Sequence, residues 1–282
     1  MAMIHTGDGP DDVRLHVQRL SPPDGRPPTA TAVLLHGLLT DSLASWYFTV
    51  APDLAAAGLE VVMYDQRGHG RSERPDSGYR LDAFVTDLER LLDRLEITGP
   101  VHLMGNCFGA TVAFGYAVRH PERVAGICAI EAKPATESWL TEISGIFRRV
   151  VAELLGHEAE SLAWLSAHRG AHTARLAKQA ARLVRTTSIA EDIPESRTVS
   201  EEQLRRVRCP VLAVYGADSD LAGQEGWLES VLPGTRTVVL PGQGHWVLAE
   251  APKHIRELLL SWTREPGAGA PAAVAPLEAD AP

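Results

Sequence analysis

Short apolar runs alternate with helical patterns along most of this sequence, and that alternation constrains the fold more than any other feature. The runs are rich in β-branched residues, are bounded by Gly, Pro, Asp or Asn, and occupy residues 32–35, 61–64, 101–104, 124–130, 211–215 and 237–240. Such runs are typical of central strands that are buried on both faces. Helical candidates lie between or after them, at residues 81–94, 109–120 and 253–262. We therefore predict an α/β fold with a mostly parallel sheet and helices on both faces.

The domain organisation follows from where this alternation of strand and helix patterns begins, is interrupted and ends. Residues 134–206 show helical periodicity and no clear strand, so they predict a helical cap inserted into a core of residues 13–133 and 207–264. Residues 13–20 alternate apolar and polar side chains, as an edge strand would. The polar residues 1–12 and the Pro/Ala/Gly-rich residues 265–282 are expected to be disordered tails.

A cysteine stands between two glycines at the end of one predicted strand. The stretch Gly105-Asn106-Cys107-Phe108-Gly109 follows the run at 101–104 and opens the next helix. A nucleophile on such a turn is held above the sheet, and the glycines allow strand and helix to approach closely. The helix N-terminus favours a thiolate. We predict that Cys107 is a nucleophile; the alternative is a buried structural cysteine.

A His-Gly pair follows the first central strand and predicts an oxyanion hole. After His36-Gly37 the chain can turn so that the N–H of Leu38 faces the reacting carbonyl, together with the N–H of Phe108. We expect the substrate pocket to be lined by His36, Trp139, Trp164 and Trp246.

A base and an acid are predicted from the last two strand ends. His245, between Gly244 and Trp246, follows the final strand and can act as general base. The loop after residues 211–215 holds two carboxylates, Asp218 and Asp220, that could orient the histidine, and we favour Asp220. Glu131, at the end of the run at 124–130, is a third possibility.

Taken together, these motifs resemble the α/β-hydrolase superfamily from about Val13 to Trp262. The resemblance rests on His36-Gly37, the turn at 65–72, the turn around Cys107, the loop at 216–220 and Gly244-His245. It implies a structural role for Asp65, Arg67 and His69. It also implies that cysteine replaces the usual serine nucleophile, and the chain looks most like the capped esterase and thioesterase group. Epoxide hydrolases and haloalkane dehalogenases of this fold need an aspartate at that position.

The function expected from these residues is acyl chemistry on a Cys-His-Asp triad. A thiolate attacks an ester, thioester or lactone to form an acyl-Cys intermediate, which water or an acceptor then resolves. A thioesterase, cyclase or acyl-transfer enzyme of bacterial natural-product biosynthesis fits this chemistry. The alternative is a non-catalytic small-molecule-binding protein on the same scaffold, although folding alone does not need the histidine, the acid and both glycines.

Composition and charge limit the kinds of partner that this chain is expected to bind. A formal net charge of −9 argues against nucleic acid. We see no signal peptide and no apolar stretch long enough for a bilayer, and the three cysteines are not closely paired, so we expect a cytoplasmic protein without a membrane partner. No spacing predicts a metal or a cofactor.

Arginines in the cap, including Arg148 and Arg149, leave two interpretations open: a solvated face of a lid, or a docking patch for an acidic carrier protein that brings the acyl group.

Overall fold

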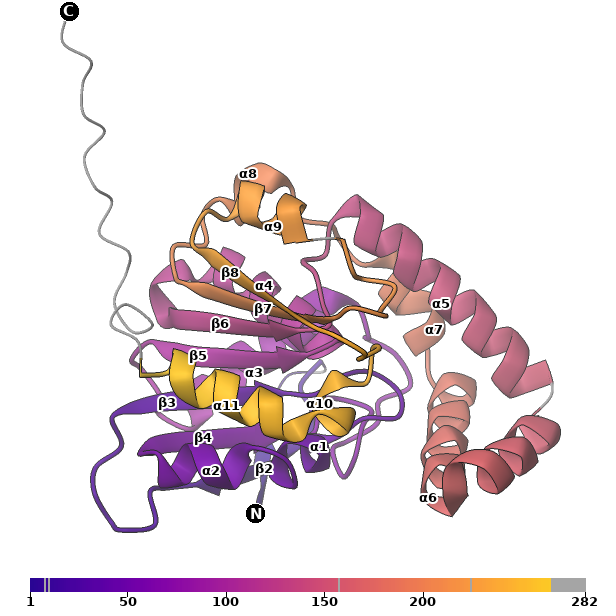
Figure 1. The fold of residues 1–282 in the computed structure, drawn as a ribbon. Helices are drawn as coiled ribbons and strands as arrows, with labels where there is room; N and C mark the ends of the chain where they lie inside the picture. The colour runs from indigo at the N-terminus through magenta and orange to yellow at the C-terminus, as the bar shows by residue number, and fades with distance from the viewer. Residues whose placement is uncertain (8, 10, 157, 224, 265–282) are drawn as a thin grey trace, which may run out of the picture.

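An eight-stranded sheet forms the centre of the computed structural model (Figure 1). The structure describes residues 1–7, 9, 11–156, 158–223 and 225–264; the tail predicted at 265–282 lies outside them. The strands follow the order β1-β2-β4-β3-β5-β6-β7-β8. Their bounds are β1 Ala2–His5, β2 Arg14–Leu20, β3 Ala30–Leu35, β4 Leu59–Tyr64, β5 Val101–Asn106, β6 Val124–Ile130, β7 Val211–Gly216 and β8 Thr235–Leu240.

The sheet confirms the predicted α/β class. Strands β3 to β8 run parallel, whereas β1 and β2 pair antiparallel with each other and β2 pairs antiparallel with β4. Three expectations were wrong. Residues 2–5 are not part of a disordered tail but the edge strand β1, with Ala2 opposite Val17, so β2 is an inner strand. Residues 237–240 belong to the other edge strand, β8, which is only partly buried and not central.

Helices cover both faces of the sheet because successive strand residues point to opposite sides. In β3, Val33 and Leu35 enter one core cluster, and Ala32 and Leu34 enter the other. The first cluster lies under α3 (Leu81–Arg94) and α4 (Phe108–Arg119), and the second lies under α1 (Leu43–Tyr47), α2 (Ala51–Ala56), α10 (Val247–Glu250) and α11 (Pro252–Trp262). Two further short helices are η1 (Pro121–Arg123), before β6, and α9 (Glu225–Val231), between β7 and β8.

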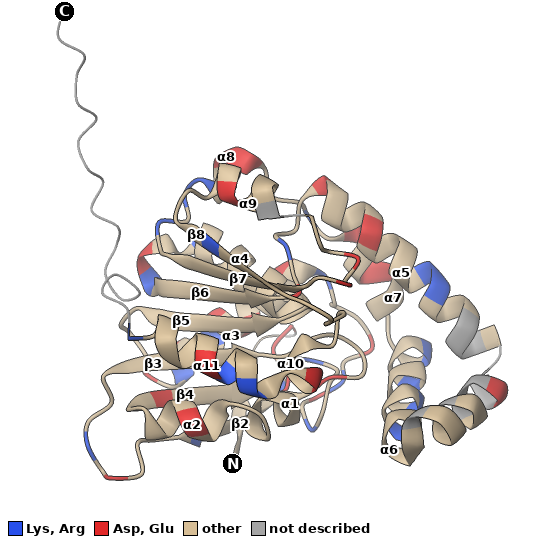
Figure 2. Ribbon diagram, in the orientation of Figure 1, with Lys and Arg blue, Asp and Glu red and all other residues tan. Residues whose placement is uncertain are grey.

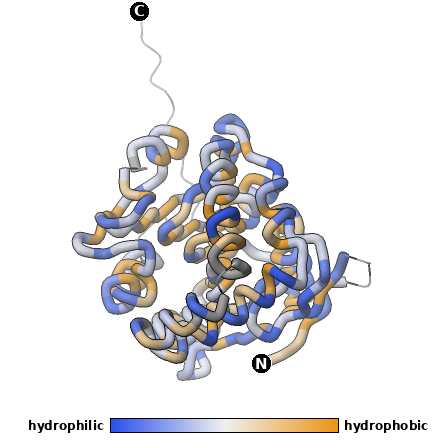
Figure 3. Tube along the Cα trace, turned by 90° about the vertical axis from the view of Figure 1, so that its right-hand side faces the viewer, coloured by the Kyte–Doolittle hydropathy of each residue, from blue (hydrophilic) through white to orange (hydrophobic). Residues whose placement is uncertain are grey.

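The segment expected to form a cap is helical. Between β6 and β7 the chain forms α5 (Glu137–Gly156), α6 (Glu158–Thr186), α7 (Ile189–Asp192), η2 (Ile193–Glu195) and α8 (Glu201–Leu204). Helix α6 is broken at Gly170, where φ is 87°. Figure 1 shows α5 and α6 standing off one end of the sheet, and Figure 3 views the molecule from this side, where hydrophilic and hydrophobic segments alternate along the chain. In α5, Trp139, Ile143 and Phe147 follow one another at a spacing of four and join the core cluster, which fixes this helix to the core.

Across the described part of the chain, no helix has the length and apolar character that crossing a membrane requires.

Candidate active site

Cys107 occupies a strained turn between β5 and α4. Its φ is 50° and its ψ is −124°, a conformation that a non-glycine residue adopts only when its surroundings enforce it. A Cβ on Gly105 would lie 2.2 Å from the N of Ala110, and a Cβ on Gly109 would lie 2.2 Å from the O of Leu35. The two glycines therefore let α4 start directly against β5 and β3, as the sequence predicted, and the turn presents the cysteine at the carboxyl end of the sheet.

The other two cysteines lie in the interior. Cys128 and Cys209 are buried, and burial raises the pKa of both thiols, that of Cys209 to about 12. Cys107 is partly exposed. Of the three, Cys107 is thus the thiol that a reagent or substrate can reach.

His245 lies between the Cys107 sulfur and the Glu131 carboxylate. Its Nδ1 is 3.1 Å from Oε2 of Glu131. Hydrogen bonding to Cys107 and then to Glu131 raises the pKa of His245 to about 10, against the opposing effect of burial. The side chain of His245 is 43% exposed, so water weakens these interactions but leaves their direction. At neutral pH the ring is therefore protonated, which pairs a cation with the sulfur.

Glu131 is held by the loop in which we expected the acid. The N–H of Gly216 donates to Oε1 at 2.5 Å, and the hydroxyl of Ser219 donates to Oε2 at 2.5 Å. Glu131 itself has a φ of 51° and a side chain with no exposed area. These two donors fix the Glu131 carboxylate in place, so that its negative charge faces the imidazole of His245.

The preference for Asp220 is corrected by this geometry. Asp218 and Asp220 are both exposed, and the carboxylate that contacts His245 is Glu131, which the sequence had offered as the third alternative. The physical reason lies in the sheet: Glu131 comes directly after β6, beside the strand that carries Cys107, whereas the loop after β7 supplies hydrogen-bond donors. The available signal was a lone charged residue at the end of an uninterrupted apolar strand.

The two N–H groups predicted to form an oxyanion hole are free of partners within the described residues. Leu39, with a φ of 63°, donates its N–H to Nε2 of His69 at 2.8 Å, and Thr40 donates to the O of Leu38 at 2.8 Å. Neither the N–H of Leu38 nor that of Phe108 is used in this way among those residues. Phe108 begins α4, where N–H groups have no partner inside the helix.

His36 is a structural residue and not part of a pocket wall, which corrects the prediction. It is completely buried, its Nε2 accepts from the N–H of Gln66 at 2.9 Å, and its Nδ1 donates to the O of Gly37 at 2.7 Å. His69 is similarly fixed: its Nδ1 donates to the O of Arg67 at 2.8 Å, and burial, then His36, lowers its pKa to about 3. Arg67 pairs with Asp87 at 2.6 Å, in keeping with its expected structural role.

The three tryptophans expected at the pocket lie in different places. Trp139 is buried and stacks on the Phe108 ring, with centroids 6.3 Å apart. Trp246 is 59% exposed and meets the His245 ring edge-on. Trp164 is 55% exposed on α6 and stacks on His168. Two of the three thus adjoin the candidate site, and no contact of the described residues brings Trp164 to it.

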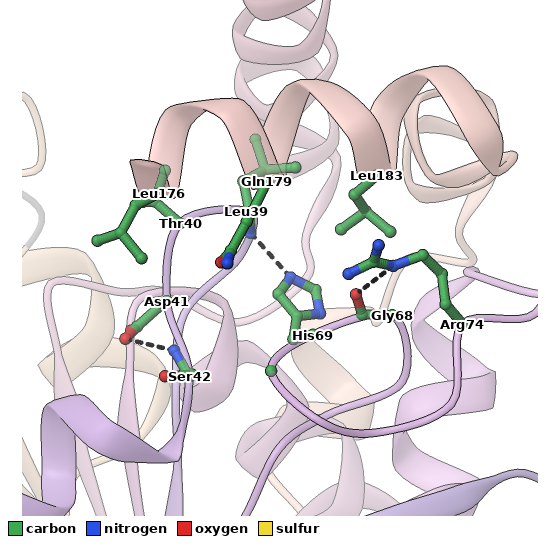
Figure 4. Close-up of a pocket in the computed structure, with 11 residues that line it drawn as sticks. Leu39, Thr40, Asp41, Ser42, Gly68, His69, Arg74, Leu176, Gln179 and Leu183 are labelled. Carbon is green, nitrogen blue, oxygen red and sulfur yellow. Dashed lines mark hydrogen bonds between the residues drawn. The ribbon is translucent and has the colours of Figure 1, made fainter. Parts of the chain in front are cut away.

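A small cavity lies between the loop after β3, the loop after β4 and α6 (Figure 4). Its volume is about 50 Å³. The lining residues are Leu39, Thr40, Asp41, Ser42, Gly68, His69, Gly70, Arg74, Leu176, Gln179 and Leu183. Cys107, Glu131 and His245 do not line it. Within the residues that the structure covers, no group of three or more His, Cys, Asp or Glu side chains could hold a metal ion.

Known proteins share this fold and parts of this sequence. A family model described as alpha/beta hydrolase fold matches residues 32–252. Epoxide hydrolase B of Mycobacterium tuberculosis is 38% identical over 132 residues, which is 46% of this chain and 36% of that protein. The chain thus spans just over a third of that relative's length. A thermophilic esterase from Thermogutta terrifontis superposes with a TM-score of 0.75 at 20% identity, covering 96% of this chain and 100% of the other. A structure from a study of carboxylesterases of Nitrososphaera gargenis gives a TM-score of 0.74 at 23% identity, covering 92% and 97%.

Proposed function

The chain belongs to the α/β-hydrolase fold family, and from this premise we propose that it is an enzyme that forms an acyl thioester on Cys107 and passes the acyl group to water or another acceptor. The observation that carries the proposal is the placing of His245 between the Cys107 sulfur and the buried Glu131 carboxylate. The acid of the proposed triad is Glu131. The substrates are esters, thioesters or lactones.

The first half of the reaction uses the sulfur as nucleophile. Sγ attacks the acyl carbonyl carbon, and the π electrons of the carbonyl move to its oxygen, which receives hydrogen bonds from the N–H groups of Leu38 and Phe108. As the carbonyl re-forms, the bond to the leaving oxygen or sulfur breaks. The protonated ring of His245 gives its proton to that leaving group, and Glu131 stabilises the charged ring beforehand.

The second half returns the enzyme to its starting state. His245, now neutral, removes a proton from the incoming water or acceptor, whose oxygen or sulfur attacks the thioester carbonyl. The C–S bond breaks, and Cys107 leaves as a thiolate next to the reprotonated ring. The raised pKa of His245, to about 10, supports a protonated ring at the end of the cycle.

A cysteine favours acyl substrates over epoxides. The relative from Mycobacterium tuberculosis is named an epoxide hydrolase. A thiolate that opened an epoxide would leave a thioether, which has no carbonyl for water to attack. Such an adduct would end turnover after one event, whereas an acyl thioester is hydrolysed readily.

Intact-mass measurement after mixing the protein with p-nitrophenyl acetate or an acyl thioester tests the proposal. We expect one acyl group per chain on Cys107, lost with time, and no adduct on Cys107→Ala. Cys209→Ala is the matched control, because Cys209 is buried, and it should acylate like the wild type. No adduct on the wild type, or equal labelling of Cys107→Ala, would overturn the proposal and favour a binding protein.

A carrier-bound substrate is the more specific version of this proposal. Arg148 and Arg149 on α5 and Arg175, Arg182 and Arg185 on α6 are exposed, and Figure 2 shows basic residues on both helices, together with acidic ones on α5. In a chain with a net charge of −9, such a group favours an acidic partner. Charge reversal of Arg148 and Arg149 should slow turnover of an acyl carrier protein thioester but not of a small ester; equal effects on both substrates would remove this version.

A further inference from the structure

Three consecutive residues of the loop after β3, Gly37, Leu38 and Leu39, differ in the hydrogen-bond partners of their N–H groups. We call this segment, residues 37–41, the oxyanion loop. The N–H of Gly37 donates to Oδ2 of Asp41 at 2.7 Å, and the N–H of Leu39 donates to His69 at 2.8 Å. Only the middle one, from Leu38, is left without a partner among the described residues. The loop therefore has its outer donors fixed, which orients the one that remains.

The oxygen of Asp41 that holds this loop also holds the turn around the nucleophile. Oδ2 accepts from Nδ2 of Asn106 at 3.2 Å, and Asn106 directly precedes Cys107. The two segments touch beside this contact, since a Cβ on Gly37 would lie 3.3 Å from Cβ of Cys107 and 3.1 Å from Oδ2 of Asp41. One atom thus bridges the two pieces of chain that carry the proposed oxyanion donors.

The second oxygen of Asp41 is fixed by the start of α1. Oδ1 accepts from the N–H of Ser42 at 2.8 Å and from the hydroxyl of Ser45 at 2.5 Å. The carboxylate as a whole receives four hydrogen bonds, and its position is therefore determined by the surrounding fold and not by side-chain freedom.

We propose that Asp41 is a positioning residue that sets the distance between the N–H groups of Leu38 and Phe108, and so builds the oxyanion hole. This inference rests on the proposed function. It requires a carboxylate: the two backbone donors, Gly37 and Ser42, lie on opposite oxygens, and an amide presents only one oxygen. Asp41→Asn must therefore direct its NH₂ at one of these N–H groups.

The test compares two reactions of the same sulfur. Acylation by p-nitrophenyl acetate builds an oxyanion, whereas alkylation by iodoacetamide does not. For Asp41→Asn we expect the single-turnover acylation rate to fall about 10- to 100-fold, on the scale of a lost or displaced oxyanion donor. The alkylation rate should stay within about twofold. Equal falls in both rates, or no fall in acylation, would overturn the inference.

A thionoester gives a second readout that a merely structural role would not move. Sulfur accepts hydrogen bonds weakly, so a correctly built oxyanion hole favours the oxygen ester. We expect the oxygen-to-sulfur rate ratio to shrink in Asp41→Asn. An unchanged ratio contradicts the proposal even if the variant is slower.

Two further variants separate this inference from folding and from the proposed function. Glu60→Gln makes the same acid-to-amide change near the start of β4, at the opposite end of the parallel strands, where Glu60 accepts from Arg19 and Ser21; its acylation rate should match the wild type. Asn106→Ala removes one contact of Asp41 and serves if Asp41→Asn fails to fold; its acylation should slow and its alkylation should not. If the wild type itself forms no adduct, the proposed function fails. If the wild type acylates and both Asp41→Asn and Asn106→Ala acylate as fast as it does, only the role of Asp41 fails.

Discussion

At the scale of single residues, Glu131 helps to keep His245 charged. Hydrogen bonding to Cys107 and then to Glu131 raises the pKa of the imidazole, and Glu131→Gln removes the second effect while keeping the shape. We expect the steady-state rate to fall about 100-fold or more, by the loss of charge stabilisation on the ring. We also expect the alkaline limb of the pH–rate profile to move to lower pH, because a ring with a lower pKa loses its proton sooner.

Measured pH–rate profiles of four proteins check this expectation. Asp218→Asn and Asp220→Asn are the matched controls, since both side chains are exposed, and each should keep the wild-type profile within about twofold in rate. If Asp220→Asn were the slow variant and Glu131→Gln the normal one, the contact seen between His245 and Glu131 would have no catalytic meaning.

At the scale of elements, the close approach of α4 to the sheet depends on a missing side chain. A Cβ on Gly109 would lie 2.2 Å from the O of Leu35, and backbone cannot move aside cheaply. Gly109→Ala should lower the free energy of unfolding by about 2–4 kcal/mol, as overpacked sites do. Gly145→Ala in α5 meets nothing within 4 Å and should raise it by about 0.5–1 kcal/mol through helix propensity. Urea unfolding measures both, and equal effects would contradict the argument.

The elements that the sequence predicted well are those whose signal is local. Residues 124–130 and 81–94 coincide with β6 and α3, because burial in the core sets the spacing of apolar residues along these segments. Strand β1 was missed since its four residues are stabilised by pairing with β2, a partner that local pattern does not reveal. Likewise the contact between Glu131 and His245 joins residues 114 apart in sequence. The sequence was enough to predict that the site lies at the strand ends. To decide which of the three carboxylates contacts His245, the order of the strands in the sheet was needed.

At the scale of the whole molecule, stability should fall in mild acid because of a buried histidine. His102 packs edge-on against Trp262, its Nδ1 has no partner among the described residues, and burial lowers its pKa to about 4. The unfolded chain, with an ordinary histidine pKa of about 6.5, binds the proton first. The contribution of neutral His102 to stability is therefore full above about pH 6.5 and is lost as the pH falls toward 4, by about 2 kcal/mol between pH 7 and pH 5.

Unfolding by urea at pH 7 and pH 5 measures that loss. His102→Leu should reduce the difference between the two free energies by about the amount given above, whatever its effect at pH 7. His168→Gln is the control, because His168 is exposed on α6. A pH dependence of His102→Leu that equals the wild type would mean that other groups cause the acid sensitivity.

The supports of the three proposed catalytic groups differ in rigidity. Cys107 and Glu131 follow β5 and β6, which are neighbours in the middle of the sheet. His245 comes after the edge strand β8, where Val239 is 41% exposed, and local opening of native proteins begins at such weakly packed margins. On warming, we expect the segment that carries His245 to open locally, so that the imidazole leaves Cys107, while the remaining secondary structure persists. Turnover should then cease several degrees below the midpoint seen by circular dichroism, and cooling should restore it.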